Sequence, residues 1–194
     1  NSTLQKMDNL VLAAEINQKV LYKPIFNTNY GYVNLITDSD GVTRKFHSSL
    51  QEEINPFAIE VFNKYNSNKN LESKEYIINY ANIPGSFESY SAYEVLNSNA
   101  NFSNKIVLIG ATAPNLHDNY FVPTSNGIAM SGVEIHANII QNILLDNFLT
   151  KQKTFSILIL ALIFSILGFF ILSRLKFYYL IPITLIVILL YTLS

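Results

Sequence analysis

Two long apolar runs dominate the pattern of hydrophobic and polar positions in this chain. The first run is Phe155–Leu172 and the second is Phe177–Leu193. Each is long enough to cross the hydrocarbon of a bilayer as a helix that rises about 1.5 Å per residue. The sequence therefore predicts two transmembrane helices, residues 155–172 and 177–193, and makes the lipid bilayer a partner of the chain.

The connection between the runs sets the expected orientation. From Phe155 to the end the chain has no acidic residue, and its two basic residues, Arg174 and Lys176, lie in this connection. Short loops that carry Arg and Lys face the cytoplasm. We therefore expect residues 173–176 inside the cell and residues 1–154 outside it, in a multi-pass protein of a bacterial inner membrane. This orientation, and the lack of a signal peptide pattern at Asn1, predict further membrane segments before and after this chain.

The polar part, residues 1–150, alternates strand-like and helix-like patterns. The expected strands are Lys19–Ile25, Gly31–Ile36, Val42–Phe46, Glu75–Tyr80 and Lys105–Gly110. The expected helices start at Asn55-Pro56, at the capping box Ser91–Glu94, and at Val133, the last one reaching Phe148. Such alternation is typical of an α/β domain with a mixed, partly parallel sheet. The core of Lys105–Gly110 is apolar without alternation, so we expect this strand at the centre of the sheet, covered on both faces.

Charge and composition exclude several functions. All 14 acidic residues, but only 11 of the 13 basic ones, precede Phe155, so the polar part is negative and does not favour nucleic acid. The chain has no cysteine, which excludes disulfides, thiolate zinc sites and thiol catalysis. No nucleophile motif of the Gly-x-Ser-x-Gly kind and no pair of metal-ligand motifs is present. We therefore predict no catalytic residue, no metal and no cofactor.

Asp38-Ser39-Asp40-Gly41 is similar to the start of a calcium-binding loop. That loop needs a third ligand before the glycine and a bidentate Glu six positions after it, where this chain has His47. The segment is instead predicted to be a tight turn with Gly41 at positive φ.

The loop after Lys105–Gly110 is the best candidate for a binding site. Ligands of open α/β sheets bind beyond the carboxyl ends of strands, where this loop begins. It brings several polar side chains within a short span, and the predicted ligand-binding residues are Thr112, His117, Asp118 and Asn119, with Asn115 beside them. The alternative is a surface loop whose side chains satisfy its own backbone.

The start of the last helix has a structural explanation. Ser131 and Glu134 have the spacing of a capping box. Glu134 and His136 point to nearly opposite sides of a helix, which argues against a metal pair. His136 shares a stripe with Val133 and Ile140, and is predicted to be a hydrogen-bonded core histidine.

Three segments together resemble one family, the second type of CHASE domain (cyclases/histidine kinases associated sensory extracellular). They are Gly31–Phe46, Tyr76–Leu96 and, above all, Lys105–Leu144. The positions that match its most recognisable motif are Gly110, Thr112, Asp118, Gly132, Glu134, His136 and Asn138. All but Thr112 and Asp118 of these are interpreted as structural.

This resemblance implies an extracytoplasmic input domain of a bacterial signalling protein. Its membrane helices would lead to a cytoplasmic output domain, an adenylate or diguanylate cyclase or a protein kinase, that is not in this chain. It also implies a homodimer and an extracytoplasmic ligand of unknown identity. Two alternatives stay open: an envelope hydrolase that uses Asn115–Asn119 with His136, and a periplasmic protein-interaction scaffold.

Overall fold

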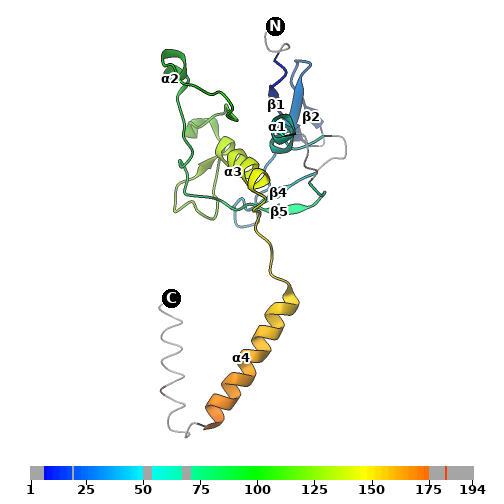
Figure 1. Ribbon diagram of the computed structural model, residues 1–194, viewed down its shortest axis with the longest axis vertical. Coiled ribbons are helices and arrows are strands. Elements are labelled where there is room, and N and C mark those ends of the chain that lie inside the picture. The colour runs from blue at the N-terminus through cyan, green and yellow to red at the C-terminus, as the bar shows by residue number, and fades with distance from the viewer. Residues whose placement is uncertain (1–6, 19, 50–53, 67–70, 175–181, 183–194) are drawn as a thin grey trace. The chain divides into compact units, whose positions relative to one another are not determined.

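Figure 1 shows the computed structural model, which describes residues 7–18, 20–49, 54–66, 71–174 and 182. The chain divides into two compact units, Asn1–Thr150 and Lys151–Ser194.

The first unit is a mixed α/β domain, as the sequence predicts, but its strands form small separate sheets. The strands are β1 (Val11–Asn17), β2 (Val20–Tyr22), β3 (Asn29–Tyr32), β4 (Lys45–His47), β5 (Glu75–Ile77), β6 (Asn119–Tyr120) and β7 (Met130–Ser131). The helices are α1 (Phe57–Tyr65), α2 (Ala92–Asn97) and α3 (Gly132–Leu145), with a short 3₁₀ helix, Pro114–Leu116. Within the described residues, one sheet has the order β2-β1-β3, with β1 and β3 parallel, and β4–β5 and β6–β7 are antiparallel pairs.

Helix α3 holds the centre of this unit. Ile135, Ile139 and Ile143, spaced by four, are fully buried and form one stripe of the helix. Helix α1 packs against both α3 and the β1–β3 pair, and it contributes Ala58 and Phe62 to the same core. Burial of each such side chain contributes about 2 kcal/mol. Figure 1 shows α3 surrounded by the other elements, whereas α2 stands apart from them and has no buried residue.

Strand β1 was not among the predicted elements. It pairs in parallel with β3, and Asn34 closes the pair by accepting from the N–H of Ile16 (2.8 Å) and donating to its carbonyl (2.9 Å). The sheet then lies directly against the start of α1. A Cβ on Gly31 would lie 2.5 Å from the Cα of Phe57, so only glycine permits this approach.

The predicted N-terminal cap is present in α2 but not in α1. The capping box of α2 is confirmed: Ser91 Oγ accepts from the N–H of Glu94, and the Glu94 carboxylate accepts from the N–H of Ser91. The expected cap of α1 is wrong, because Pro56 occupies the N-cap position and Asn55 makes no cap bond. The Asn55 amide donates instead to Glu60 Oε1, at 2.7 Å.

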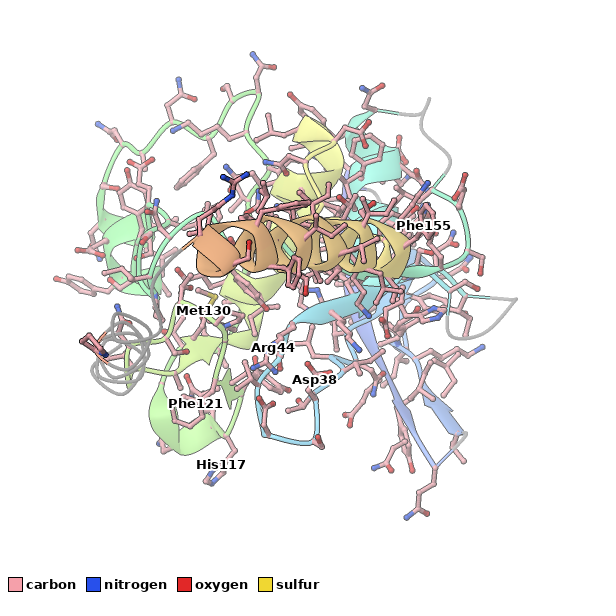
Figure 2. All side chains as sticks on the ribbon, turned by 90° about the horizontal axis from the view of Figure 1, so that it is seen from below. Asp38, Arg44, His117, Phe121, Met130 and Phe155 are labelled. Carbon is pink, nitrogen blue, oxygen red and sulfur yellow. The ribbon has the colours of Figure 1, made fainter. Side chains whose placement is uncertain are left out.

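The turn at Asp38–Gly41 is confirmed. Gly41 has φ +80° and its N–H donates to the Asp38 carbonyl at 2.9 Å. Arg44 donates to both carboxylates of the turn, and Figure 2 shows Arg44 beside Asp38. This guanidinium lowers the pKa of Asp40 to about 2. Both aspartates are therefore committed to an ion pair within the turn.

The segment Lys105–Gly110 is not the central strand that its composition predicts. Within the described residues its only backbone hydrogen bond joins the N–H of Lys105 to the carbonyl of Phe102. Ile106 and Leu108 pack on the core, whereas Ile109 is 96% exposed. An apolar run indicates burial on both faces only where a neighbouring strand and a second layer are present, and here one face is open.

Replacing Ile109 by asparagine is therefore expected to change the free energy of unfolding by less than about 0.5 kcal/mol. Ile139→Ala, at a fully buried position of α3, is the matched comparison and should cost about 3 kcal/mol. Urea unfolding of the full chain in detergent micelles, followed by tyrosine fluorescence, measures both. A loss at Ile109 as large as that at Ile139 would contradict the exposed position.

The second unit contains helix α4, Thr154–Arg174. The window Thr154–Ile171 has a mean hydropathy of 2.7, and none of its positions is buried, so this helix is long and apolar enough to cross a membrane. The helix includes Ser173 and Arg174, which the sequence analysis assigns to the connecting loop. The second predicted helix, residues 177–193, falls on residues whose structure is not described, apart from Pro182.

Candidate functional site

Two of the motif residues that precede α3, Gly110 and Asp118, pack against its first turn. The N–H of Gly132 donates to the Asp118 carbonyl at 2.9 Å, and a Cβ on Gly132 would lie 2.4 Å from Asp118 Oδ1. The Asp118 carboxylate thus rests on the first residue of the helix, where the helix dipole favours negative charge. A Cβ on Gly110 would lie 2.6 Å from the Cβ of Val133. Both glycines are therefore explained by close packing at this helix end.

The four predicted ligand-binding residues have different surroundings. Asp118 faces Gly132, and together with burial its charge raises the pKa of the Tyr120 hydroxyl. Asn119 lies in β6, opposite Ser131 of β7. Thr112 and His117 are exposed, and Figure 2 shows His117 directed away from the body of the domain. Within the described residues no hydrogen bond joins Thr112 or His117 to Asp118.

Glu134 does not cap its own helix, so this prediction is wrong. Ser131 is the N-cap residue of α3, but its side chain makes no cap hydrogen bond. The Glu134 carboxylate instead accepts from the N–H groups of Gly85, at 2.8 and 3.0 Å, and of Ser86, at 3.1 Å. Gly85 has φ +85°, which turns these two N–H groups toward the carboxylate. The side chain therefore holds a distant turn rather than its own helix end.

Glu134 is the first of three polar residues on one line of α3. Asn138 Oδ1 accepts from the N–H of Ala81 at 3.2 Å. Asn142 accepts from the N–H of Asn79 at 2.7 Å and donates to its carbonyl at 2.9 Å. We call Glu134, Asn138 and Asn142 the polar stripe. Its members are spaced by four, so they lie above one another on the helix and hold segment 79–86 along its length.

Asn142 was missed by the sequence analysis, and Asn138 was included only through the motif. Both are buried, each only 1% exposed. A buried amide requires hydrogen-bond partners, and the unpaired backbone of segment 79–86 supplies them. The signal in the sequence is the spacing of these three polar residues by four within a largely apolar helix.

His136 is the hydrogen-bonded core histidine that was predicted. It is 8% exposed, its Nε2 donates to the Val33 carbonyl at 3.2 Å, and its ring meets the ring of Phe57 edge-on at 5.5 Å. Its Nδ1 is buried without a partner in the described structure. Burial lowers the pKa of His136 to about 4. The neutral ring therefore joins α3 to the β3 side of the domain, and no hydrogen bond connects it with the loop Asn115–Asn119.

The arrangement is suited to positioning rather than to chemistry. No group of three or more His, Asp or Glu side chains within the described ranges is placed to hold a metal ion. The side chains of the polar stripe form hydrogen bonds with groups of the same domain, most of them backbone groups. What it can do physically is to tie the position of segment 79–86 to that of α3.

Comparison with known proteins identifies one family. The family model described as "CHASE2 domain" matches residues 1–174. The match covers the whole first unit and α4. No curated protein and no solved structure gives a significant match.

Proposed function

This chain belongs to the CHASE2 family, a family of sensory extracellular domains of membrane proteins, and from that premise we propose that its first unit is the extracytoplasmic input module of a bacterial transmembrane signalling protein. In this proposal the membrane helices pass the signal to a cytoplasmic cyclase or protein kinase domain. The family is sensory and has no catalytic activity of its own, so this chain acts through its conformation.

The polar stripe is the observation that supports this proposal. Segment 79–86 is hydrogen-bonded at three levels to α3, so a shift of the segment acts on the helix directly. Asp146 is the C-cap residue of α3, and its N–H donates to the Asn142 carbonyl. The N–H of Leu149 donates to the carbonyl of Ile77 in β5, at 3.0 Å. Only the short segment 150–153 then separates this anchored end from α4 in the sequence.

The energetic scale of such a sensor is modest. A ligand shifts an equilibrium between two states only by its difference in affinity for them, and coupling between sites is typically about 1–3 kcal/mol. One hydrogen bond of the polar stripe contributes about 1 kcal/mol. Loss or gain of two or three such bonds is therefore enough to switch the module.

We further propose that the chain works as a homodimer in the membrane. The exposed side chains of α2, Tyr93 at 77% and Leu96 at 84%, are apolar surface that association would cover. Chemical crosslinking of the full chain in membranes measures the oligomeric state. A crosslinked species at twice the monomer mass is expected, and a monomer at every crosslinker concentration would contradict the homodimer.

Sidedness is the test of the input function. The chain has no cysteine, so single substitutions serve as reporters: Asn97→Cys, in the exposed helix α2, and Ser173→Cys, near the end of α4. A membrane-impermeant maleimide applied to intact spheroplasts should label Asn97→Cys, and it should label Ser173→Cys only after permeabilisation. Labelling of Ser173→Cys in intact spheroplasts would exclude the proposed orientation and, with it, an extracytoplasmic input.

A further inference from the structure

A cavity of about 250 Å³ lies beside the polar stripe, between α3 and the segment that the stripe holds. Its walls come from two parts of the chain that are far apart in the sequence: Ala81, Asn82, Ile83, Ser86, Phe87 and Glu88 on one side, and Glu134, Asn138 and Gln141 of α3 on the other. The helical residues are spaced by four and three, so they form one face of α3. This volume is below the range of drug-sized pockets, which restricts an occupant to a small molecule.

The charge of the cavity is negative. Glu88 and Glu134 supply two carboxylates, and none of the residues that line it is basic. The Glu88 carboxylate also accepts from the Tyr90 hydroxyl through Oε1 and pairs with the Nζ of Lys105 through Oε2, so part of its charge is already compensated. The three hydrogen bonds donated by the N–H groups of Gly85 and Ser86 hold the Glu134 carboxylate in place and compensate part of its charge. Carboxylates only accept hydrogen bonds, so an occupant must donate them, and a cationic donor is favoured over a neutral one.

Two amides of the cavity are available to an occupant. Within the described residues, the side chains of Asn82 and Gln141 have no hydrogen-bond partner, whereas the Asn138 amide is used by Ala81 and Glu134. Gln141 is half-buried in the wall of the cavity. The amide oxygens add two acceptors to the carboxylates, and the ring of Phe87 and the side chain of Ile83 add apolar surface for a short carbon chain.

The chain itself shows that an ammonium group suits this environment. Lys105 places its Nζ 3.7 Å from Glu88 Oε2, with both side chains more than half exposed. This pair is long and screened by water, so it contributes little stability. A free amine that enters the cavity meets the same carboxylate together with Glu134 and the two amides.

We propose that the cavity lined by Glu88, Glu134 and Gln141 binds a small aliphatic amine through its ammonium group. Such a ligand contacts segment 81–88 and α3 at once, and so stabilises the arrangement in which the polar stripe holds the two together. Its role as a signal rests on the proposed input function, whereas binding itself does not.

Calorimetric titration of the full chain in nanodiscs tests this site, with butane-1,4-diamine and n-butylamine as probes and n-butanol as the neutral comparison. The variants are Glu88→Gln, which removes one carboxylate, and Gln141→Leu, which removes an amide that makes no hydrogen bond with the residues that the structure describes. Glu15→Gln, an exposed carboxylate of β1, is the control. Thermal unfolding of each variant without ligand verifies that it is folded.

The amines are expected to bind and the alcohol is not. Glu88→Gln and Gln141→Leu should each weaken amine binding about tenfold, a loss of about 1.4 kcal/mol, while Glu15→Gln binds as the unchanged chain does. The proposal is overturned if neither amine binds, if butanol binds as well as butylamine, or if both cavity variants bind like Glu15→Gln. The assay has no readout of orientation, so its failure leaves the input function intact, and a failed labelling experiment leaves amine binding intact.

Discussion

Replacement of Asn142 by alanine is expected to destabilise the first unit by about 3 kcal/mol. The Asn142 amide is 1% exposed and satisfies both the N–H and the carbonyl of Asn79. Alanine leaves the N–H and the carbonyl of the half-buried Asn79 without this partner, and each such group costs about 1–3 kcal/mol. The loss should be among the largest that a single side chain of this domain produces, since typical substitutions cost about 1 kcal/mol.

Urea unfolding of the full chain in detergent micelles measures this loss. The chain has 12 tyrosines and no tryptophan, so tyrosine fluorescence reports mainly on the first unit, which contains most of them. Gln141→Ala is the control, because the side-chain amide of Gln141, next to Asn142 in the sequence, makes no hydrogen bond within the described structure. This substitution should change the free energy of unfolding by less than about 0.5 kcal/mol. Equal effects of the two substitutions would show that the polar stripe does not hold segment 79–86.

The second large effect is a loss of stability as the pH falls from about 6.5 to about 4. Burial lowers the pKa of His136 from 6.5 to about 4 in the folded chain. Over this range the unfolded chain takes up a proton at His136 and the folded chain does not, so acid favours unfolding. The difference in pKa corresponds to about 3 kcal/mol at pH 4 relative to pH 7, and below pH 4 both states are protonated and this loss stops growing.

The measurement is the free energy of unfolding at pH 7, 6, 5 and 4 for the chain and for His136→Gln. Glutamine has no charge to gain, so the variant should lose about 3 kcal/mol less over this range, whatever its stability at pH 7. The comparison removes the contribution of carboxylates such as Asp40, which is the same in both proteins. Because the pKa of Asp40 is lowered to about 2, the stability that this carboxylate contributes is lost only as the pH falls below about 4. Parallel pH curves for the two proteins would mean that His136 is not buried in its neutral form.

Short-range signals explain which elements could be predicted. The capping box of α2 and the Asp-x-Asp-Gly turn each depend on hydrogen bonds between residues at most six apart. The apolar stripe of α3 depends on spacing alone, and the helix begins and ends close to its predicted bounds. The buried position of His136 follows from the same stripe, because it shares this face with residues of the core.

Contacts between distant residues explain the failures. Glu134 has a partner for capping within three residues, but it bonds to Gly85 and Ser86, almost fifty positions away. The composition of Lys105–Gly110 predicts a central strand, yet whether a strand is central depends on neighbours that its own residues do not specify. The same reason gives Asp118, packed on Gly132, and the exposed His117 beside it different surroundings, and ligand binding at this loop stays a prediction.

The sequence alone was thus sufficient to predict the apolar helix that ends at Arg174 and the family of the chain. It was also sufficient to predict α3, whose buried face follows from the spacing of its apolar residues. These properties depend on local hydrophobicity and on motifs read in order. Folding alone decided that three polar residues of α3 would bond to the backbone of segment 79–86 and that a cavity would open beside them. Hydrogen bonds between residues some fifty or sixty positions apart form only when packing buries both partners together. No local sequence pattern specifies which distant residues become neighbours.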